Sequence, residues 1–396
     1  MENISVREAA EKWGISVRRV QTLCSNGRIN GAVRFGRSWM IPADAQKPDD
    51  PRRERDMSRE ALNVEFSSFI EKIGEPMPRD NPDSILDTVN DERERRQFVA
   101  QLAYLRGDFQ KVLSCFRKAE GDFIARSCIA PFAIAAAASL GDFDTCTEIS
   151  KPYKLHDVGS TRDVISYFEE LNFATIAMSA TAPSMMPDWI KAGDFSNLPG
   201  ILQIEAFQIR ARYLLAIGRT EAALAVAETA LAIYSGDRGI RYFTIGLLLA
   251  CATSCYVLDR TEECRRWLME TLHICLPHGF VTPIAEMLLN FGGIAEKCIL
   301  QIYPESYDAV IGQCKRTIKN WIFFHNYFTK ENITDILTIR EYHIAQLVAQ
   351  RIPYAEIASR QGVSVSSIKK TVQNIYAKLF VSNRTELAKL VLLGKS

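Results

Sequence analysis

The sequence predicts a mainly α-helical protein in which an array of repeated helix pairs lies between two small terminal modules. Apolar residues recur at helical spacing over most of the 396 residues. Short motifs recur in the middle of the chain at steps of 34 and 41 residues. Each end contains a Gly-X-Ser turn between two short predicted helices. These patterns divide the chain into the segments 1–45, 46–90, 91–330 and 335–396.

The C-terminal segment divides into four short predicted helices. The first opens at Leu337, and the fourth covers residues 385–392. Gly362-Val363-Ser364 predicts a tight turn between the second and third helices, because glycine adopts positive φ at little cost and a serine side chain caps a following helix. The second and third helices are predicted over Tyr354–Gln361 and Val365–Leu379.

The third of these helices combines an apolar stripe with a polar face. Ile368, Val372 and Ile375 recur on one side and are expected to face a core. The opposite side offers ammonium, amide and hydroxyl groups, which reach phosphates and base edges when a helix enters a DNA major groove. The candidate DNA-binding residues are Ser366, Ser367, Lys369, Lys370 and Gln373.

Charge separates the two ends of the chain from its middle. Residues 335–396 contain nine Lys and Arg against four Asp and Glu, and residues 1–42 contain seven against three. Because the whole chain is formally +1, the middle carries an excess of negative charge. Positive charge on a small module is typical of phosphate neutralisation, so we expect the ends to bind double-stranded DNA. The alternative for a charged helix is a merely solvated surface.

The C-terminal segment resembles the LuxR (GerE-like) DNA-binding domain. The resemblance implies that the third helix enters the groove and that the fourth supplies contacts of a homodimer. Arg351 and Phe380 stand where that family usually has glycine, Pro353 replaces a usual hydroxyl cap, and Thr371 replaces a common histidine. The matching motifs are Leu337-Thr338-Ile339-Arg340-Glu341, Glu356-Ile357-Ala358, Val363-Ser364, Ser367-Ile368-Lys369, Ile375-Tyr376-Ala377-Lys378-Leu379 and Asn383-Arg384-Thr385-Glu386-Leu387.

The N-terminal segment repeats this logic in a shorter form. Ser5 and Glu8 form the pattern of a capping box before a helix over Val6–Trp13. The Gly14-Ile15-Ser16 turn then leads into a second helix over residues 17–26, and residues 32–41 alternate around a glycine as a β-hairpin does. The candidate DNA-binding residues are Arg18, Arg19, Gln21 and Thr22 on the second helix and Arg34 and Arg37 on the hairpin.

These N-terminal residues look like the winged helix-turn-helix of the MerR and excisionase group. The resemblance implies a helix in the major groove and a wing against the backbone or minor groove. A degenerate module that is kept for protein contacts is the alternative. The matching residues are Ala9-Ala10, Gly14-Ile15-Ser16, Val20, Gly27-Arg28-Ile29 and Gly36-Arg37-Ser38-Trp39-Met40-Ile41-Pro42.

The segments between the ends show one helix flanked by breaks and then a helical array. A polar stretch over residues 44–56 favours an exposed tether, residues 59–73 predict a helix, and residues 74–82 contain three prolines. Leu105-Arg106-Gly107-Asp108-Phe109 recurs as Ser139-Leu140-Gly141-Asp142-Phe143, and Gly218-Arg219-Thr220-Glu221 is echoed by Asp259-Arg260-Thr261-Glu262. Such periods indicate antiparallel helix pairs stacked into a solenoid.

The array looks like tetratricopeptide-type (TPR-like) repeats, and its combination with a LuxR-type domain resembles the C-terminal half of MalT-like regulators. Those regulators carry an ATPase module, and no counterpart is expected here. The only Gly-Lys-Ser is Gly394-Lys395-Ser396, and Lys389 stands where a P-loop would have its first glycine. A solenoid offers a concave groove for a peptide, protein or small-molecule effector. A rigid spacer and dimerisation scaffold is an equally weighted alternative. Tyr213, Tyr234, Tyr242, Phe243, Tyr256 and Trp267 are candidates for a pocket, though each is more typical of a core.

Composition argues against several other classes of protein. We expect a cytoplasmic chain without membrane contact, because no signal peptide and no run of eighteen apolar residues is found. The ten cysteines lie mostly on apolar helix faces, so buried reduced thiols are expected, although Cys251 and Cys255 have the spacing of a metal or redox pair. We find no nucleophile motif, no paired carboxylates and no phosphate-binding loop in the sequence. We therefore expect neither an enzyme nor a bound cofactor.

The sequence therefore predicts a transcription regulator: a helical-repeat array flanked by an N-terminal winged helix-turn-helix and a C-terminal four-helix LuxR-type helix-turn-helix. Two alternatives belong to other classes. One is an interaction scaffold whose terminal modules contact proteins. The other is an architectural or recombination-accessory factor, which the excisionase-like end suggests.

Overall fold

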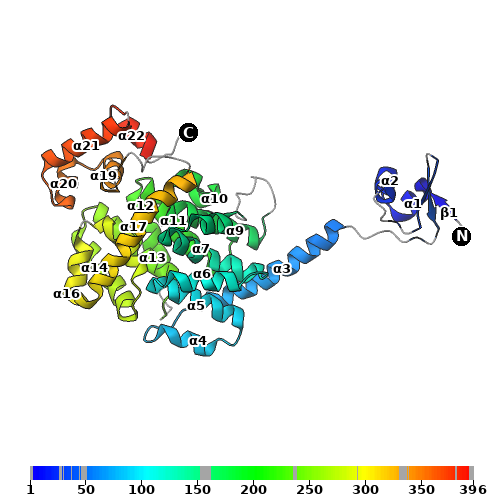
Figure 1. Cartoon of the computed structure of the whole chain (residues 1–396), viewed down its shortest axis with the longest axis horizontal. Coiled ribbons are helices and arrows are strands. Elements are labelled where there is room, and N and C mark those ends of the chain that lie inside the picture. Colours follow the sequence, from blue (N-terminus) through cyan, green and yellow to red (C-terminus); the bar gives the residue numbers. More distant parts are fainter. Residues whose placement is uncertain are drawn as a thin grey trace. The chain divides into compact units, whose positions relative to one another are not determined.

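The protein is described by a computed structural model and is predominantly helical (Figure 1). It forms two compact units, Met1–Glu65 and Phe66–Ser396. The structure describes residues 3–25, 29, 31–36, 38–43, 45, 51–151, 162–234, 239–291, 293–329, 337, 339–379 and 381–391, with some side chains inside these ranges left out.

The first unit packs two helices on a small antiparallel sheet. Ser5 accepts a hydrogen bond from the Glu8 amide while Glu8 accepts one from the Ser5 amide, so the predicted capping box is confirmed. The first strand, residues 3–5, is not predicted from the sequence. It pairs with the second strand of the hairpin, so that Ile4 lies opposite Ile41. The elements are β1 (Asn3–Ser5), α1 (Val6–Trp13), α2 (Val17–Ser25), β2 (Val33–Phe35) and β3 (Ser38–Pro42), with the strand order β1-β3-β2.

Helix α3 (Pro51–Ile73) begins earlier than the sequence predicts. Residues 51–56 were expected to be tether, and they are helical instead. Proline is tolerated in the first helical turn and Arg and Glu are good helix formers, so lack of an apolar stripe did not prevent a helix. Near its end Phe66 packs against Phe168 with ring centroids 4.9 Å apart. This part of α3 therefore belongs to the second unit.

The predicted break after α3 is non-helical and is anchored by backbone hydrogen bonds. The Met77 amide donates to the Ile240 carbonyl over 2.9 Å, and the Ile240 amide donates to the Met77 carbonyl over 2.7 Å. The helices and 3-10 turns that follow are η1 (Pro82–Ser84), α4 (Ile85–Thr88), α5 (Glu92–Arg106), α6 (Phe109–Lys118), α7 (Phe123–Leu140), α8 (Phe143–Ser150), α9 (Val164–Ser179), η2 (Pro183–Met185), α10 (Asp188–Ala192), α11 (Gly200–Ala216), α12 (Thr220–Ile233), α13 (Tyr242–Val257), α14 (Thr261–Cys275), η3 (Leu276–His278), α15 (Thr282–Met287), η4 (Leu288–Phe291), α16 (Ile294–Ile302), η5 (Pro304–Ser306) and α17 (Tyr307–Thr329).

The first pair of repeated motifs forms the same corner twice. Gly107 and Gly141 end α5 and α7 in the left-handed conformation, with φ of 78° and 76°. Asp108 and Asp142 then cap α6 and α8 by accepting hydrogen bonds from backbone amides in the first turn. In these corners glycine reverses the chain without strain and aspartate satisfies free amides. The repeated motif therefore forms the same corner in both places.

The second pair of motifs forms a related corner with one substitution. Gly218 lies between α11 and α12 with φ of 79°, and Asp259 takes the same place between α13 and α14 with φ of 61°. Aspartate is one of the few residues besides glycine that adopts this conformation readily. The echo between the two motifs therefore reflects a shared backbone geometry.

Helix α7 is long and apolar enough to cross a membrane by length and composition. Two thirds of it, 67%, is buried inside the protein. The small residues Ala130, Ala133 and Ala137 are among its buried positions. A core helix of a folded domain has these properties, so α7 is weak evidence for a membrane span.

All ten cysteines are buried free thiols, as the sequence predicts. Burial raises the pKa of Cys264 to about 12 and that of Cys314 to about 11. Cys251 and Cys255 lie in the core without a disulfide between them. Within the described ranges, no cluster of His, Cys, Asp and Glu is arranged to hold a metal ion.

The chain ends in four short helices that share one core and belong to the second unit. Their core includes Ile344, Ile357, Ile368, Ile375 and Leu387, one or two residues from each helix. The predicted bounds of the second and third helices match those observed. The elements are α19 (Ile339–Ala349), α20 (Tyr354–Gln361), α21 (Val365–Leu379) and α22 (Arg384–Val391).

Candidate nucleic-acid interface

Helix α21 is held in place by a serine cap at its start and by its apolar side. The Ser367 amide donates to the Ser364 hydroxyl over 3.1 Å, as the sequence predicts. Ile368, Val372 and Ile375 are buried against the other three helices. Gly362 ends α20 with φ of 62°, a conformation that favours glycine. The turn and the core together fix which face of α21 points outward.

The outward face of α21 carries all five candidate residues. Ser366, Ser367, Lys369, Lys370 and Gln373 are exposed. Among the described residues, neither Lys369 nor Lys370 has an ion-pair partner. Their ammonium groups are therefore open to an incoming phosphate.

Three other basic residues of the C-terminal domain have structural partners, which the sequence count could not show. Lys378 forms an ion pair with Glu341 over 2.7 Å. Arg384 donates to the carbonyls of Val348 and Ile352, both over 2.5 Å, and so binds the end of α19. The third is Arg360, which is only 8% exposed. The charge available to DNA is smaller than the sum of basic residues.

The departures from the LuxR pattern leave the helices intact but show in local geometry. Arg351 adopts a φ of 67°, the conformation for which the family uses glycine. Pro353 precedes α20 and supplies no side-chain cap. The Thr371 hydroxyl donates to the Ser367 carbonyl over 3.0 Å within α21. Phe380 lies outside the described residues.

Helix α20 docks on the helical array through Arg360. Its guanidinium donates to the Val257 carbonyl over 2.6 Å, forms an ion pair with Glu356, and lies over the Tyr256 ring at 4.9 Å from the centroid. Nearby, the Gln350 amide donates to the Leu215 carbonyl over 3.4 Å. This contact could not be predicted from the sequence, because an arginine in a basic domain is also expected to bind phosphate.

The N-terminal unit presents a second polar helix face. Arg18, Arg19, Gln21 and Thr22 are exposed on α2. The Ser16 hydroxyl accepts a hydrogen bond from the Arg19 amide over 3.3 Å, and the Thr22 hydroxyl donates to the Arg18 carbonyl over 3.0 Å. Helix α2 is thus capped at the predicted serine and keeps its basic face outward.

The hairpin adds one described basic residue to the N-terminal unit. Arg34 is exposed on β2, next to the turn at Gly36, whose φ is 61°. Val33 pairs with Met40 and Arg34 with Trp39 across the hairpin. Arg37, the other candidate on the hairpin, lies outside the described residues.

The comparisons with known proteins bear on the C-terminal helices. Residues 335–391 match the family model described as bacterial regulatory proteins, luxR family (GerE). No match was found among curated proteins or among solved structures. The match covers α19 to α22, which include the exposed face of α21. Residues 335–391 are therefore similar to the DNA-binding helix-turn-helix of the luxR family of bacterial regulatory proteins.

Proposed function

We propose that the protein regulates transcription by placing α21 in the major groove of double-stranded DNA. Lys369 and Lys370 bind phosphates and base edges, with Ser366, Ser367 and Gln373 beside them. The observation that carries this proposal is the exposure of all five side chains on one face of a helix whose opposite face is buried. A helix anchored in this way can be presented to a duplex without unfolding the domain.

The salt dependence of DNA binding tests the role of the two lysines. Each phosphate contact adds about one unit to the slope of log affinity against log salt, so the double variant Lys369→Ala, Lys370→Ala should bind more weakly and flatten that slope by up to about two units. Lys111 and Lys118 are exposed on α6 and give a matched control pair. An unchanged slope in the α21 variant would reject the assignment.

We also propose that the N-terminal unit is a winged helix-turn-helix that binds DNA as a second module. Its exposed basic helix face and the exposed Arg34 on the hairpin support this proposal. The double variant Arg18→Ala, Arg19→Ala should lower the DNA affinity of the whole chain and its salt slope. If affinity and slope stay at the wild-type values, the N-terminal unit serves protein contacts.

The helical array is proposed to be TPR-like and to link a signal to the DNA-binding domain. The recurring helix corners and the docking of α20 through Arg360 support this role. We propose a cytoplasmic, non-enzymatic homodimer in which α22 supplies the dimer contact. Light scattering of the full chain with and without DNA tests the dimer. A chain that shows no DNA affinity at low salt would instead favour the interaction scaffold, and DNA bending without transcriptional output would favour the accessory factor.

A further inference from the structure

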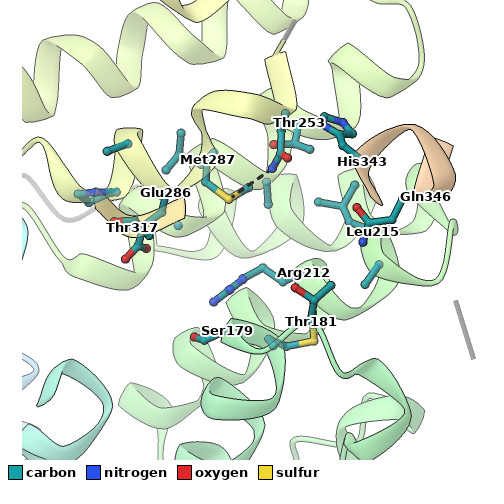
Figure 2. Close-up of a pocket in the computed structure, with 18 of the residues that line it drawn as sticks. Ser179, Thr181, Arg212, Leu215, Thr253, Glu286, Met287, Thr317, His343 and Gln346 are labelled. Atoms are coloured by element: carbon teal, nitrogen blue, oxygen red, sulfur yellow. Dashed lines mark hydrogen bonds between the residues drawn. The ribbon is translucent and has the colours of Figure 1, made fainter. Parts of the chain in front are cut away.

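The second unit contains a cavity of about 350 Å³ between the helical array and the first helix of the LuxR-type domain (Figure 2). Residues of α7, α9, α11, α13, α15, α17 and α19 line it. Tyr242 and Tyr256, two of the aromatic residues that the sequence offers as pocket candidates, are among them. The volume lies within the range of small-molecule sites, which is about 300–1,000 Å³.

The cavity contains an arginine that makes no hydrogen bond or ion pair with the described part of the chain. Figure 2 shows the Arg212 side chain extending from α11 into the open space. Among the described residues, its guanidinium forms neither a hydrogen bond nor an ion pair. Arg212 is half-buried, and a guanidinium in such a place binds a carboxylate or phosphate through charge-assisted hydrogen bonds. Arg212 therefore supplies a site for an anionic group.

The cavity also contains a carboxylate that does not neutralise this arginine. Glu286 on α15 accepts a hydrogen bond from the Tyr104 hydroxyl over 2.5 Å and forms no ion pair with Arg212. Desolvation by the surrounding helices raises the pKa of Glu286, while the hydrogen bond from Tyr104 and the charge of Arg212 lower it. Its side chain is exposed and lines the cavity. A cationic group beside it would stabilise the ionised form.

The remaining wall is largely apolar, and the hydroxyl groups of Thr253 and Tyr256 in it lack a hydrogen-bond partner among the described residues. Thr253 is 7% exposed, and its hydroxyl has no hydrogen-bond partner among the described residues. Figure 2 shows Thr253 across the cavity from Arg212. Apolar side chains from five helices complete the wall: Ala135, Ala138, Met178, Leu249, Phe324 and Leu347.

We propose that this cavity binds a small zwitterion with an apolar part, of the chemical class of a free apolar amino acid. The ligand carboxylate would accept hydrogen bonds from Arg212, its ammonium group would lie beside Glu286, and its apolar part would fill the remaining space. A simple carboxylate leaves Glu286 without a cationic partner and adds a second negative charge to the cavity. A simple amine leaves Arg212 without a partner. The two separated protein charges therefore select for a ligand that carries both.

Occupation of the cavity is linked to the DNA-binding domain, and this step rests on the proposed function. Tyr342, His343, Gln346 and Leu347 of α19 contribute to the wall. A ligand that contacts them stabilises the docked position of the domain, and by thermodynamic reciprocity a change in docking alters ligand affinity. The ligand is thus expected to change the DNA affinity of the full chain.

Direct binding to the full chain tests the ligand class without relying on DNA. Leucine, methionine, phenylalanine and tryptophan are titrated by calorimetry and by thermal shift. The matched probes for leucine are 4-methylpentanoate, which lacks the ammonium group, and 3-methylbutylamine, which lacks the carboxylate. We expect at least one amino acid to bind and to do so at least tenfold more tightly than its two singly charged analogues. Equal binding of either analogue, or no binding of any amino acid, overturns the proposal.

Charge-removing variants locate the site. Arg212→Gln and Glu286→Gln should each weaken binding at least tenfold, and Gln at position 286 retains an acceptor for Tyr104. Arg117→Gln and Glu120→Gln change exposed residues at the end of α6 and should bind as wild type. If Arg212→Gln fails to fold, as judged by circular dichroism, Arg212→Lys keeps the charge without the two-pronged donor and should still weaken binding. Full affinity in both Glu286→Gln and the folded Arg212 variant overturns the assignment.

A DNA-binding measurement with and without the amino acid separates the two proposals. A ligand that binds the chain and changes its DNA affinity supports both the site and its link to α19. Ligand binding by a chain with no DNA affinity contradicts the proposed function but leaves the site standing. DNA binding by a chain that binds none of the amino acids contradicts the site alone.

Discussion

Arg351 shows how a single backbone conformation can cost stability in this domain. Its φ of 67° is left-handed, and a non-glycine residue there is strained by about 1 kcal/mol or more. The side chain is exposed, and among the described residues it has no ion-pair partner that would offset the strain. The domain thus tolerates the backbone strain at Arg351 without an ion pair of that side chain to compensate for it.

Replacing Arg351 by glycine should therefore raise the free energy of unfolding. The gain is expected to reach up to about 1 kcal/mol, because the greater flexibility of glycine in the unfolded chain offsets part of the relieved strain. Thermal denaturation of the full chain measures the effect. Arg340→Gly, which places glycine near the start of α19, is the control and should lower stability. Destabilisation by both substitutions would contradict the strain argument.

His343 gives the docked domain a dependence on pH. Burial first, and the charge of Arg360 second, lower the pKa of His343 from 6.5 to about 4. Below pH 6.5 the unfolded chain binds a proton at this residue that the folded protein does not bind. The stability that this neutral histidine contributes is therefore present above pH 6.5 and is lost as the pH falls toward 4.

The expected result is a fall in melting temperature between pH 7 and pH 5 that is smaller in His343→Gln than in the wild type. A difference of about 2 °C or more between the two falls would be clear for a unit of this size. His273 does not line the cavity that His343 lines. The melting temperature of His273→Gln should therefore fall as far as that of the wild type. Identical pH profiles for all three proteins would mean that His343 titrates normally.

At the scale of elements, α21 depends on its first turn. Ser364 caps it, and the loss of such a cap costs about 1 kcal/mol. Two of the proposed DNA contacts, Ser366 and Ser367, lie in that turn. The cap thus connects the stability of the helix with the position of its binding groups.

Ser364→Ala should lower both stability and DNA affinity, since the first turn of α21 loses its fixed geometry. Ser364→Asp keeps a capping acceptor, so it should retain stability while the added negative charge repels phosphate and lowers affinity. Ser359→Ala, on the exposed face of α20, is the control for both measurements. If Ser364→Ala binds DNA as tightly as the control, the cap does not order the binding face.

Local patterns in the sequence predicted the helices and corners well. The bounds of α1, α20 and α21, the capping box at Ser5 and the corners at Gly107 and Gly141 follow from caps and glycines that are read within a few residues. The exposed face of α21 follows from the apolar stripe opposite it. Strand β1 was missed because three residues carry too little periodicity, and its partner β3 lies more than thirty residues away.

Contacts between distant segments could not be predicted. The cavity combines residues from Ala135 to Gln350, and no local pattern marks Arg212 or Glu286 as its charged pair. Arg360 has the composition of a DNA contact but binds the array, because tertiary packing decides which of several similar arginines is buried. Residue type and spacing alone do not distinguish these cases.

At the scale of the whole second unit, Arg360 is expected to hold the DNA-binding domain on the array. Arg360→Ala removes the hydrogen bond to the Val257 carbonyl and the ring contact with Tyr256. Hydrogen exchange should become faster at residues 354–361 and at the end of α13, and the melting temperature should fall. The salt slope of DNA binding should not change, since Arg360 lies away from the exposed face of α21. Arg351→Ala is the control, and wild-type exchange in Arg360→Ala would reject the docking role.

The burial of α7 has a consequence for how this chain is made. Its apolar surface is covered partly by α17, where Phe324 joins the same core and the Asn320 amide donates to the Ser139 carbonyl over 2.8 Å. During synthesis α7 leaves the ribosome before α17 has been made. The apolar surface of α7 therefore stays uncovered until α17 packs against it. Premature stop codons that remove α17 should yield fragments that aggregate or bind chaperones. We expect this even though all the helices before α17 are present in such fragments.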